Sequence, residues 1–88
     1  MTTLVNGQAG THLPIADRGL QYGDGLFDTL ALRNGEPLLW DRHMQRLGEG
    51  CRRLGLPAPE AGLLREEVAR IAGTEARAVA KITLTRGA

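Results

Sequence analysis

The fold is decided by the stretch Leu26-Phe-Asp-Thr-Leu-Ala-Leu-Arg-Asn-Gly-Glu-Pro-Leu-Leu-Trp40. At its centre is Asn34-Gly35, and both residues accept the positive φ that a two-residue type I′ turn requires. The runs on either side have strand character, so the stretch predicts a β-hairpin with strands over 26–33 and 36–40. A second Asn-Gly pair, Asn6-Gly7, predicts a shorter hairpin near the N-terminus.

The predicted strand over 26–33 has two different faces, because side chains alternate along a strand. One face carries Phe27, Thr29 and Ala31, and the other carries Leu26, Asp28, Leu30 and Leu32. A period of two returns near the C-terminus, where residues 78–85 alternate in the same way. The sequence therefore predicts a third strand over 78–85.

Between these strands, apolar residues recur at helical spacing. A helix over 42–54 is predicted by one apolar stripe, which consists of Met44, Leu47, Cys51 and Leu54. We expect Asp41 to be its N-cap and Gly55 to end it. A second apolar stripe predicts another helix over 60–72.

The elements follow one another as hairpin, hairpin, helix, helix, strand, without the regular alternation of strands and helices that a parallel sheet needs. This order predicts an α+β fold, a two-layer sandwich of an antiparallel sheet with two helices. The chain ends at Arg86-Gly87-Ala88, directly after a predicted strand. We therefore expect residues 1–88 to be the first segment of a longer protein.

The composition limits the kinds of partner that the protein can bind. A net charge of +1 and only three aromatic residues are unfavourable for nucleic acid. No apolar run approaches the roughly 20 residues of a membrane span, and the N-terminus lacks the features of a secretory signal. The single cysteine, Cys51, excludes an internal disulfide and any Cys-x-x-Cys metal site. We expect a cytoplasmic protein that binds neither nucleic acid nor a membrane and holds no metal.

A glycine-rich stretch, Asp17-Arg-Gly-Leu-Gln-Tyr-Gly-Asp-Gly-Leu-Phe27, precedes the first long strand. It is not a Walker A loop, because no Gly-Lys-Ser/Thr follows, and it is not a dinucleotide fingerprint, because it precedes a strand. The glycines fit either a tight loop or the close approach of a ligand. Tyr22 and Phe27 flank them, which favours a ligand surface.

Three further side chains have both a functional and a structural interpretation. His43 lies in the predicted helix and has no evident partner in the sequence, so it is either a surface residue or a general base. Arg46 lies at the margin of the buried stripe, where it needs an internal salt bridge or a bound anion. Lys81 is the only lysine of the chain; it can extend to solvent, or bind a cofactor if its pKa is lowered.

Four motifs, in this order and at this spacing, resemble the amino-terminal part of the fold type IV pyridoxal-phosphate enzymes. They are the glycine-rich stretch over 17–27, Asn34-Gly-Glu36, His43-Met-Gln-Arg-Leu47 and Lys81-Ile-Thr-Leu-Thr-Arg-Gly87. The family includes branched-chain aminotransferases, D-amino-acid aminotransferases and 4-amino-4-deoxychorismate lyases. The resemblance covers nearly the whole chain, and it implies that residues 1–88 are the small N-terminal domain, cut off before the catalytic domain.

The resemblance also implies a cofactor, pyridoxal 5′-phosphate, and a small-molecule substrate. Arg46 matches the arginine that binds the cofactor phosphate, and a permanently charged bidentate donor suits that task. Tyr22 and Phe27 match aromatic residues of the substrate pocket. Thr29 shares a strand face with Phe27, so we expect it to line the same pocket. The Schiff-base lysine belongs to the second domain of the family, so this segment contains no catalytic residue and Lys81 is not that lysine.

Within the family, the chain is most similar to the aminodeoxychorismate lyases, which convert 4-amino-4-deoxychorismate to 4-aminobenzoate and pyruvate for folate synthesis. This similarity implies that the full-length protein is a lyase and a homodimer, whereas the segment alone is inactive. Two alternatives stay open. One is a D-amino-acid or branched-chain aminotransferase of the same fold, and the other is an inert binding or dimerisation domain.

Overall fold

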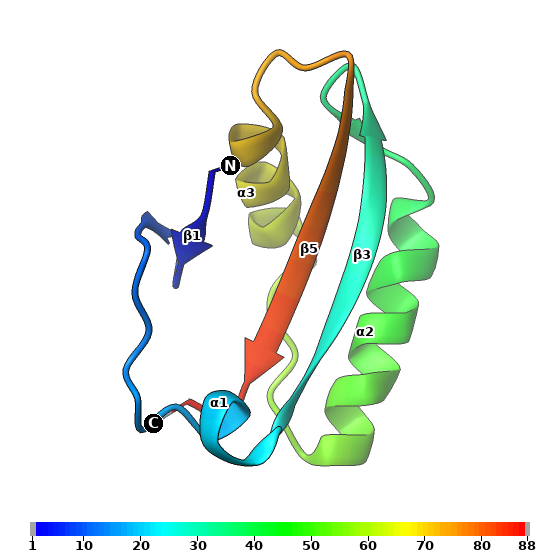
Figure 1. Ribbon diagram of the computed structural model, residues 1–88. Coiled ribbons are helices and arrows are strands. Elements are labelled where there is room, and N and C mark those ends of the chain that lie inside the picture. Colours follow the sequence, from blue (N-terminus) through cyan, green and yellow to red (C-terminus); the bar gives the residue numbers. More distant parts are fainter. Residues whose placement is uncertain (1, 88) are drawn as a thin grey trace.

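The centre of the fold is a three-stranded antiparallel sheet with the order β4-β3-β5 (Figure 1). The computed structural model describes residues 2–87. The long strands β3 (Gly25–Arg33) and β5 (Arg77–Thr85) pair with each other along their whole length. The short strand β4 (Glu36–Pro37) pairs only with the last two residues of β3. The hairpin and the third strand predicted from the sequence are thereby confirmed.

Two helices cover one face of this sheet, α2 (Trp40–Leu54) beside β3 and α3 (Ala61–Ala72) beside β5 (Figure 1). Their apolar stripes meet the even-numbered residues of the long strands in one core. The buried members of this core are Leu30, Leu32, Trp40, Leu47, Val68, Ala72, Ala80 and Ile82. The two-layer α+β architecture is therefore confirmed.

The other face of the sheet is not covered by any element that the structure describes. Its side chains are those of the odd-numbered residues over 27–33 and 77–83, and they are exposed. Phe27 and Val79 are 63% and 74% exposed, which is high for large apolar side chains. We call this surface the open face; on it lie Phe27, Thr29, Ala31, Arg33, Arg77, Val79, Lys81 and Thr83.

The predicted strand over 36–40 and the predicted cap at Asp41 are wrong. β4 ends at Pro37, and Leu39 takes a left-handed conformation with φ of 55° before the helix begins at Trp40. Asp41 lies in the first turn of α2 and is not its N-cap. Strand β4 is short because Trp40, the first residue of α2, is buried in the core between the helices and the sheet. This position removes its large apolar surface from water. The predicted end of α2 at Gly55 is confirmed.

The predicted short N-terminal hairpin is confirmed, and it contacts α3. It consists of β1 (Leu4–Val5) and β2 (Gln8–Ala9), which pair antiparallel around the Asn6-Gly7 turn. Arg70 of α3 donates a hydrogen bond to the carbonyl oxygen of Gly7 over 2.6 Å. Between residues 2 and 87 there is no helix of the length and apolar character that crossing a bilayer would require.

Candidate functional site

A buried carboxylate, two helical side chains and the free edge of a strand form the candidate site. Asp28 of β3 is only 5% exposed, and its carboxylate points toward α2. His43 Nδ1 lies 2.7 Å from Asp28 Oδ2, and Arg46 Nη2 donates a hydrogen bond to Asp28 Oδ1 over 2.5 Å. The two helical residues are three positions apart, so they share one face of α2 and reach the same carboxylate. We call these three residues the Asp28 cluster.

The cluster keeps Asp28 charged. Burial alone would raise the pKa of Asp28, but the hydrogen bonds and charges of His43 and Arg46 outweigh it and hold that pKa below its ordinary value. The Arg46 side chain, in contrast, is 63% exposed. One guanidinium nitrogen is therefore fixed by Asp28, while the rest of the group faces outward and can meet an anion.

The charge of Asp28 predicts how stability depends on pH. Because the pKa is lowered in the folded state, the contribution of the cluster is complete above about pH 5 and is lost as the pH falls below about 4. In the full-length protein, Asp28→Asn should lower the unfolding temperature at pH 6, and the difference from the wild type should shrink toward pH 3. Thermal unfolding across this range measures the difference. A difference that stays constant with pH would contradict the assignment, and Asp41→Asn, at an exposed position of α2, serves as the control.

Beside the Asp28 cluster, β3 has a free edge. β5 pairs with one side of β3 from Gly25 onward, whereas β4 pairs with the other side only at Leu32 and Arg33. Over 26–30 the second edge has no strand partner among residues 2–87. An unpaired edge presents backbone N–H and C=O groups that need a partner. A ligand along this edge can contact both the Asp28 cluster and the open face.

Phe27 and Thr29 lie on the open face, on either side of Asp28 in the sequence. They point away from α2, so the structure does not bring them onto the same face as Arg46; strand β3 separates the two groups. Lys81 Nζ lies 4.4 Å from the centre of the Phe27 ring and adds a positive charge to this part of the open face.

The glycine-rich stretch contains a short helix, α1 (Arg18–Tyr22), that the sequence did not predict. Asp17 is its N-cap and also accepts a hydrogen bond from Thr85 Oγ1 over 2.9 Å. A Cβ on Gly19 would overlap the Thr85 side chain, and one on Gly25 would overlap the Leu84 carbonyl oxygen. These glycines therefore allow the stretch to dock on β5, and the tight-loop interpretation is correct for them.

Where the glycine-rich stretch lies against β5, it contacts the motif at the C-terminal end of the chain, more than 60 residues away in the sequence. Asp24 accepts hydrogen bonds from the Nε atoms of Arg86, at 2.7 Å, and Arg18, at 3.0 Å, and these bonds hold its pKa below its ordinary value. Arg18 N also donates to the carbonyl oxygen of Gly87. Tyr22 is 72% exposed, with the Arg18 guanidinium 5.0 Å from its ring centre. Tyr22 and Phe27 are both accessible to a ligand, as is Leu20, which is 61% exposed.

Sequence reasoning missed Asp28 and was wrong to leave His43 without a partner. The signal was present, because Asp28 interrupts the apolar face formed by Leu26, Leu30 and Leu32, and a carboxylate on such a face needs a hydrogen-bond partner. Arg46 has the internal salt bridge that was one of its two interpretations. Because the rest of its guanidinium is exposed, Arg46 can also bind an anion, which was the other interpretation.

Much of the chain is similar to known proteins. Residues 25–88, more than half of the chain, match the family described as amino-transferase class IV. The chain is 39% identical over 56 residues to an aminodeoxychorismate lyase of Vibrio harveyi, covering 64% of this chain and 21% of that protein. It is 41% identical over 46 residues to a bifunctional aminodeoxychorismate lyase / D-amino acid transaminase of Mycobacterium tuberculosis, covering 52% and 16%.

Among solved structures, the fold is similar to that of 4-amino-4-deoxychorismate lyase from Pseudomonas aeruginosa. The TM-score is 0.80 and the sequence identity 48%, and the match covers 93% of this chain and 30% of that one. The chain thus spans less than a third of the length of each of these three proteins.

Proposed function

Because the chain belongs to the amino-transferase class IV family, we propose that its full-length protein is a pyridoxal-phosphate-dependent aminodeoxychorismate lyase. The names of similar proteins from three organisms support this choice of reaction. In this chain, the single observation that supports the proposal is the position of Arg46. Asp28 fixes one nitrogen of its guanidinium group, and the rest of the group is exposed beside the free edge of β3.

The Asp28 cluster fits the cofactor phosphate by its chemistry. A phosphate dianion needs a permanent positive charge and N–H donors in a fixed direction, and an arginine supplies both. The Asp28 hydrogen bond restricts the Arg46 side chain before any ligand arrives, which reduces the entropy lost on binding. His43 holds the other carboxylate oxygen, so Asp28 cannot easily turn away from Arg46.

In the proposed reaction this chain contributes binding and orientation. When bound, pyridoxal phosphate supplies an electron sink for the bonds that break in its substrate. Arg46 would hold the phosphate, while Phe27 and Thr29 would bind the substrate from the open face, with Tyr22 as a further aromatic contact. The lysine that binds the cofactor covalently is proposed to lie outside residues 1–88. We also propose a cytoplasmic homodimer for the full-length protein.

A direct assay tests this function. The full-length protein, incubated with pyridoxal phosphate and 4-amino-4-deoxychorismate, should release 4-aminobenzoate and pyruvate in equal amounts. Transamination is the second candidate, because one similar protein is described as both lyase and D-amino acid transaminase. Formation of pyruvate from D-alanine and 2-oxoglutarate, without 4-aminobenzoate release, would favour the transaminase. If cofactor-loaded protein shows neither activity and also does not transfer the amino group of a branched-chain amino acid to 2-oxoglutarate, an inert binding or dimerisation domain would be favoured.

The position of Lys81 allows a test of the proposal that the cofactor-binding lysine lies outside residues 1–88. Lys81 lies on the open face over Phe27, whereas Arg46 lies on the opposite side of β3, so we expect that Lys81 does not bind the cofactor covalently. Borohydride reduction of the cofactor-loaded enzyme followed by peptide mapping should place the pyridoxyl label outside residues 1–88. Lys81→Ala should retain the absorption band of the bound cofactor. A label on Lys81 would disprove the proposed division of roles.

A further inference from the structure

Two arginines stand directly opposite each other where the β3–β5 ladder ends. Arg33 and Arg77 are register partners and both are exposed. Like charges directly across a pair of strands destabilise it unless something neutralises them. Neither arginine takes part in any of the ion pairs among residues 2–87.

Glu36, the acidic residue nearest to Arg33 in the strand register, has another arginine as its partner. Glu36 is the β4 partner of Arg33, but its carboxylate accepts a hydrogen bond from Arg65 Nη2 of α3 over 3.0 Å. The Arg65 guanidinium also lies 5.7 Å from the ring centre of Trp40, which fixes it at the helix-covered side. Among residues 2–87, no ion pair joins this carboxylate to Arg33 or Arg77.

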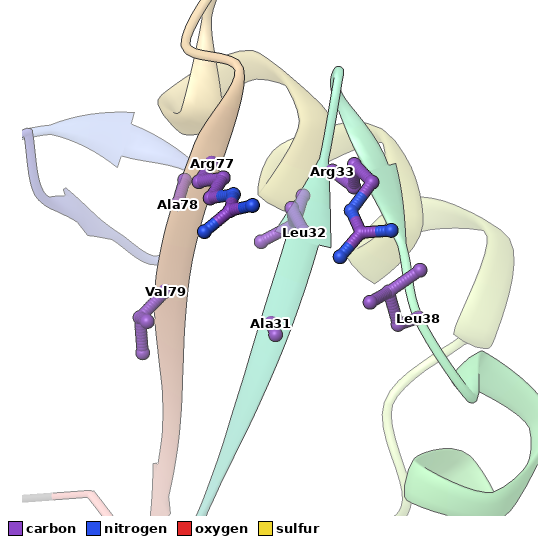
Figure 2. Close-up of a pocket in the computed structure, with 7 residues that line it drawn as sticks. All are labelled: Ala31, Leu32, Arg33, Leu38, Arg77, Ala78 and Val79. Atoms are coloured by element: carbon purple, nitrogen blue, oxygen red, sulfur yellow. The ribbon is translucent and has the colours of Figure 1, made fainter.

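The two arginines border a shallow hollow of about 420 Å³ on the open face. Apart from them, its lining consists of apolar residues: Ala31, Leu38 and Val79, together with Leu32 and Ala78, whose side chains belong to the helix-covered face. Figure 2 shows the Arg77 guanidinium directed from β5 toward β3, and the Arg33 guanidinium directed toward Leu38. Ligand sites commonly combine apolar walls with a few polar groups.

We propose that this hollow binds a small carboxylate with an apolar ring. Guanidinium groups bind carboxylates in a bidentate manner, so each of the two arginines at this rim suits a carboxylate. The apolar ring would lie against Leu38 and Val79, which are otherwise 41% and 74% exposed. A bare phosphate would satisfy the arginines but leave these walls in water, so the lining favours a carboxylate with an apolar body.

This site is separate from the proposed cofactor site. Arg33 lies five residues beyond Asp28 on β3, which corresponds to about 17 Å along an extended strand, and its side chain is on the opposite side of the sheet from Arg46. The proposal therefore does not depend on the proposed reaction.

Benzoate is a suitable probe for the full-length protein, because it combines one carboxylate with one apolar ring. Equilibrium dialysis with radiolabelled benzoate should show saturable binding. Arg33→Gln and Arg77→Gln should each weaken that binding at least about tenfold, because each removes a charge-assisted contact. Arg33→Lys should also weaken it, since a lysine keeps the charge but loses the bidentate geometry. Both positions are exposed, so the variants should fold, and unfolding temperature verifies this.

The matched control is Arg53→Gln, an exposed arginine of α2 outside the hollow, which should leave benzoate binding unchanged. Three results would overturn the proposal. The first is unchanged benzoate affinity in both arginine variants. The second is binding that is lost in Arg46→Ala but kept in Arg33→Gln, which would place benzoate at the cofactor site. The third is binding of inorganic phosphate without binding of benzoate, which would refute the ligand class.

Discussion

Replacing Arg46 with alanine is expected to weaken the retention of pyridoxal phosphate by the full-length enzyme about 10- to 100-fold. The substitution removes a charge-assisted contact to the phosphate, which contributes roughly 1.5–3 kcal/mol, and every 1.4 kcal/mol changes an affinity about tenfold. The effect should be large because Asp28 already holds the guanidinium in place, so the wild type loses little side-chain freedom on binding. Dialysis against cofactor-free buffer, followed by absorbance of the retained cofactor, measures the change.

Two companion variants make the Arg46 result specific. Arg53→Ala removes an exposed arginine from the same helix, outside the ion pairs described above, and should leave retention unchanged. Arg46→Lys should recover only part of the retention, because a lysine keeps the charge but cannot bind Asp28 and the phosphate with a rigid planar group. Equal losses in Arg46→Ala and Arg53→Ala would show that general surface charge, and not this position, holds the cofactor.

Most of the fold follows from local patterns in the sequence. The Asn34-Gly35 turn, the two-residue alternation along β3 and β5, and the apolar stripes of α2 and α3 are each contained in a short window. The error over residues 38–40 has a different origin. An apolar run such as Leu38-Leu39-Trp40 fits a strand and a helix start equally well, and the burial of Trp40 against residues far away in the sequence decides between them.

The site was less accessible to sequence reasoning because its contacts are long-range. Arg46 could be singled out alone, since an arginine beside a buried stripe needs an anion. Its partner Asp28 is 18 residues away on another element, and only the packing of α2 on β3 brings the two together. The glycine-rich stretch was ambiguous for the same reason. Its contacts with Thr85 and Arg86 join segments more than 60 residues apart.

Replacing Gly25 with valine is expected to have the second large effect, a local loss of stability of about 2–3 kcal/mol. A Cβ at this position would overlap the carbonyl oxygen of Leu84 and crowd the Cα of Thr85. These are backbone atoms of the paired strand and cannot rotate away, so the end of the β3–β5 ladder must separate. In the full-length enzyme, hydrogen exchange in peptides covering 25–33 and 77–85 should accelerate about 30- to 100-fold.

Gly50→Ala is the matched control for Gly25→Val, because it also places a new Cβ in a crowded position. There the nearest atom, 2.5 Å away, is Cδ1 of Leu26, the end of a flexible side chain that can move aside. Alanine also favours a helix over glycine by roughly 1 kcal/mol, which offsets part of the cost of moving Leu26. Exchange in the same peptides should therefore stay within about fivefold of the wild type. Similar acceleration in both variants would mean that the backbone contact between Gly25 and β5 does not explain the glycine at this position.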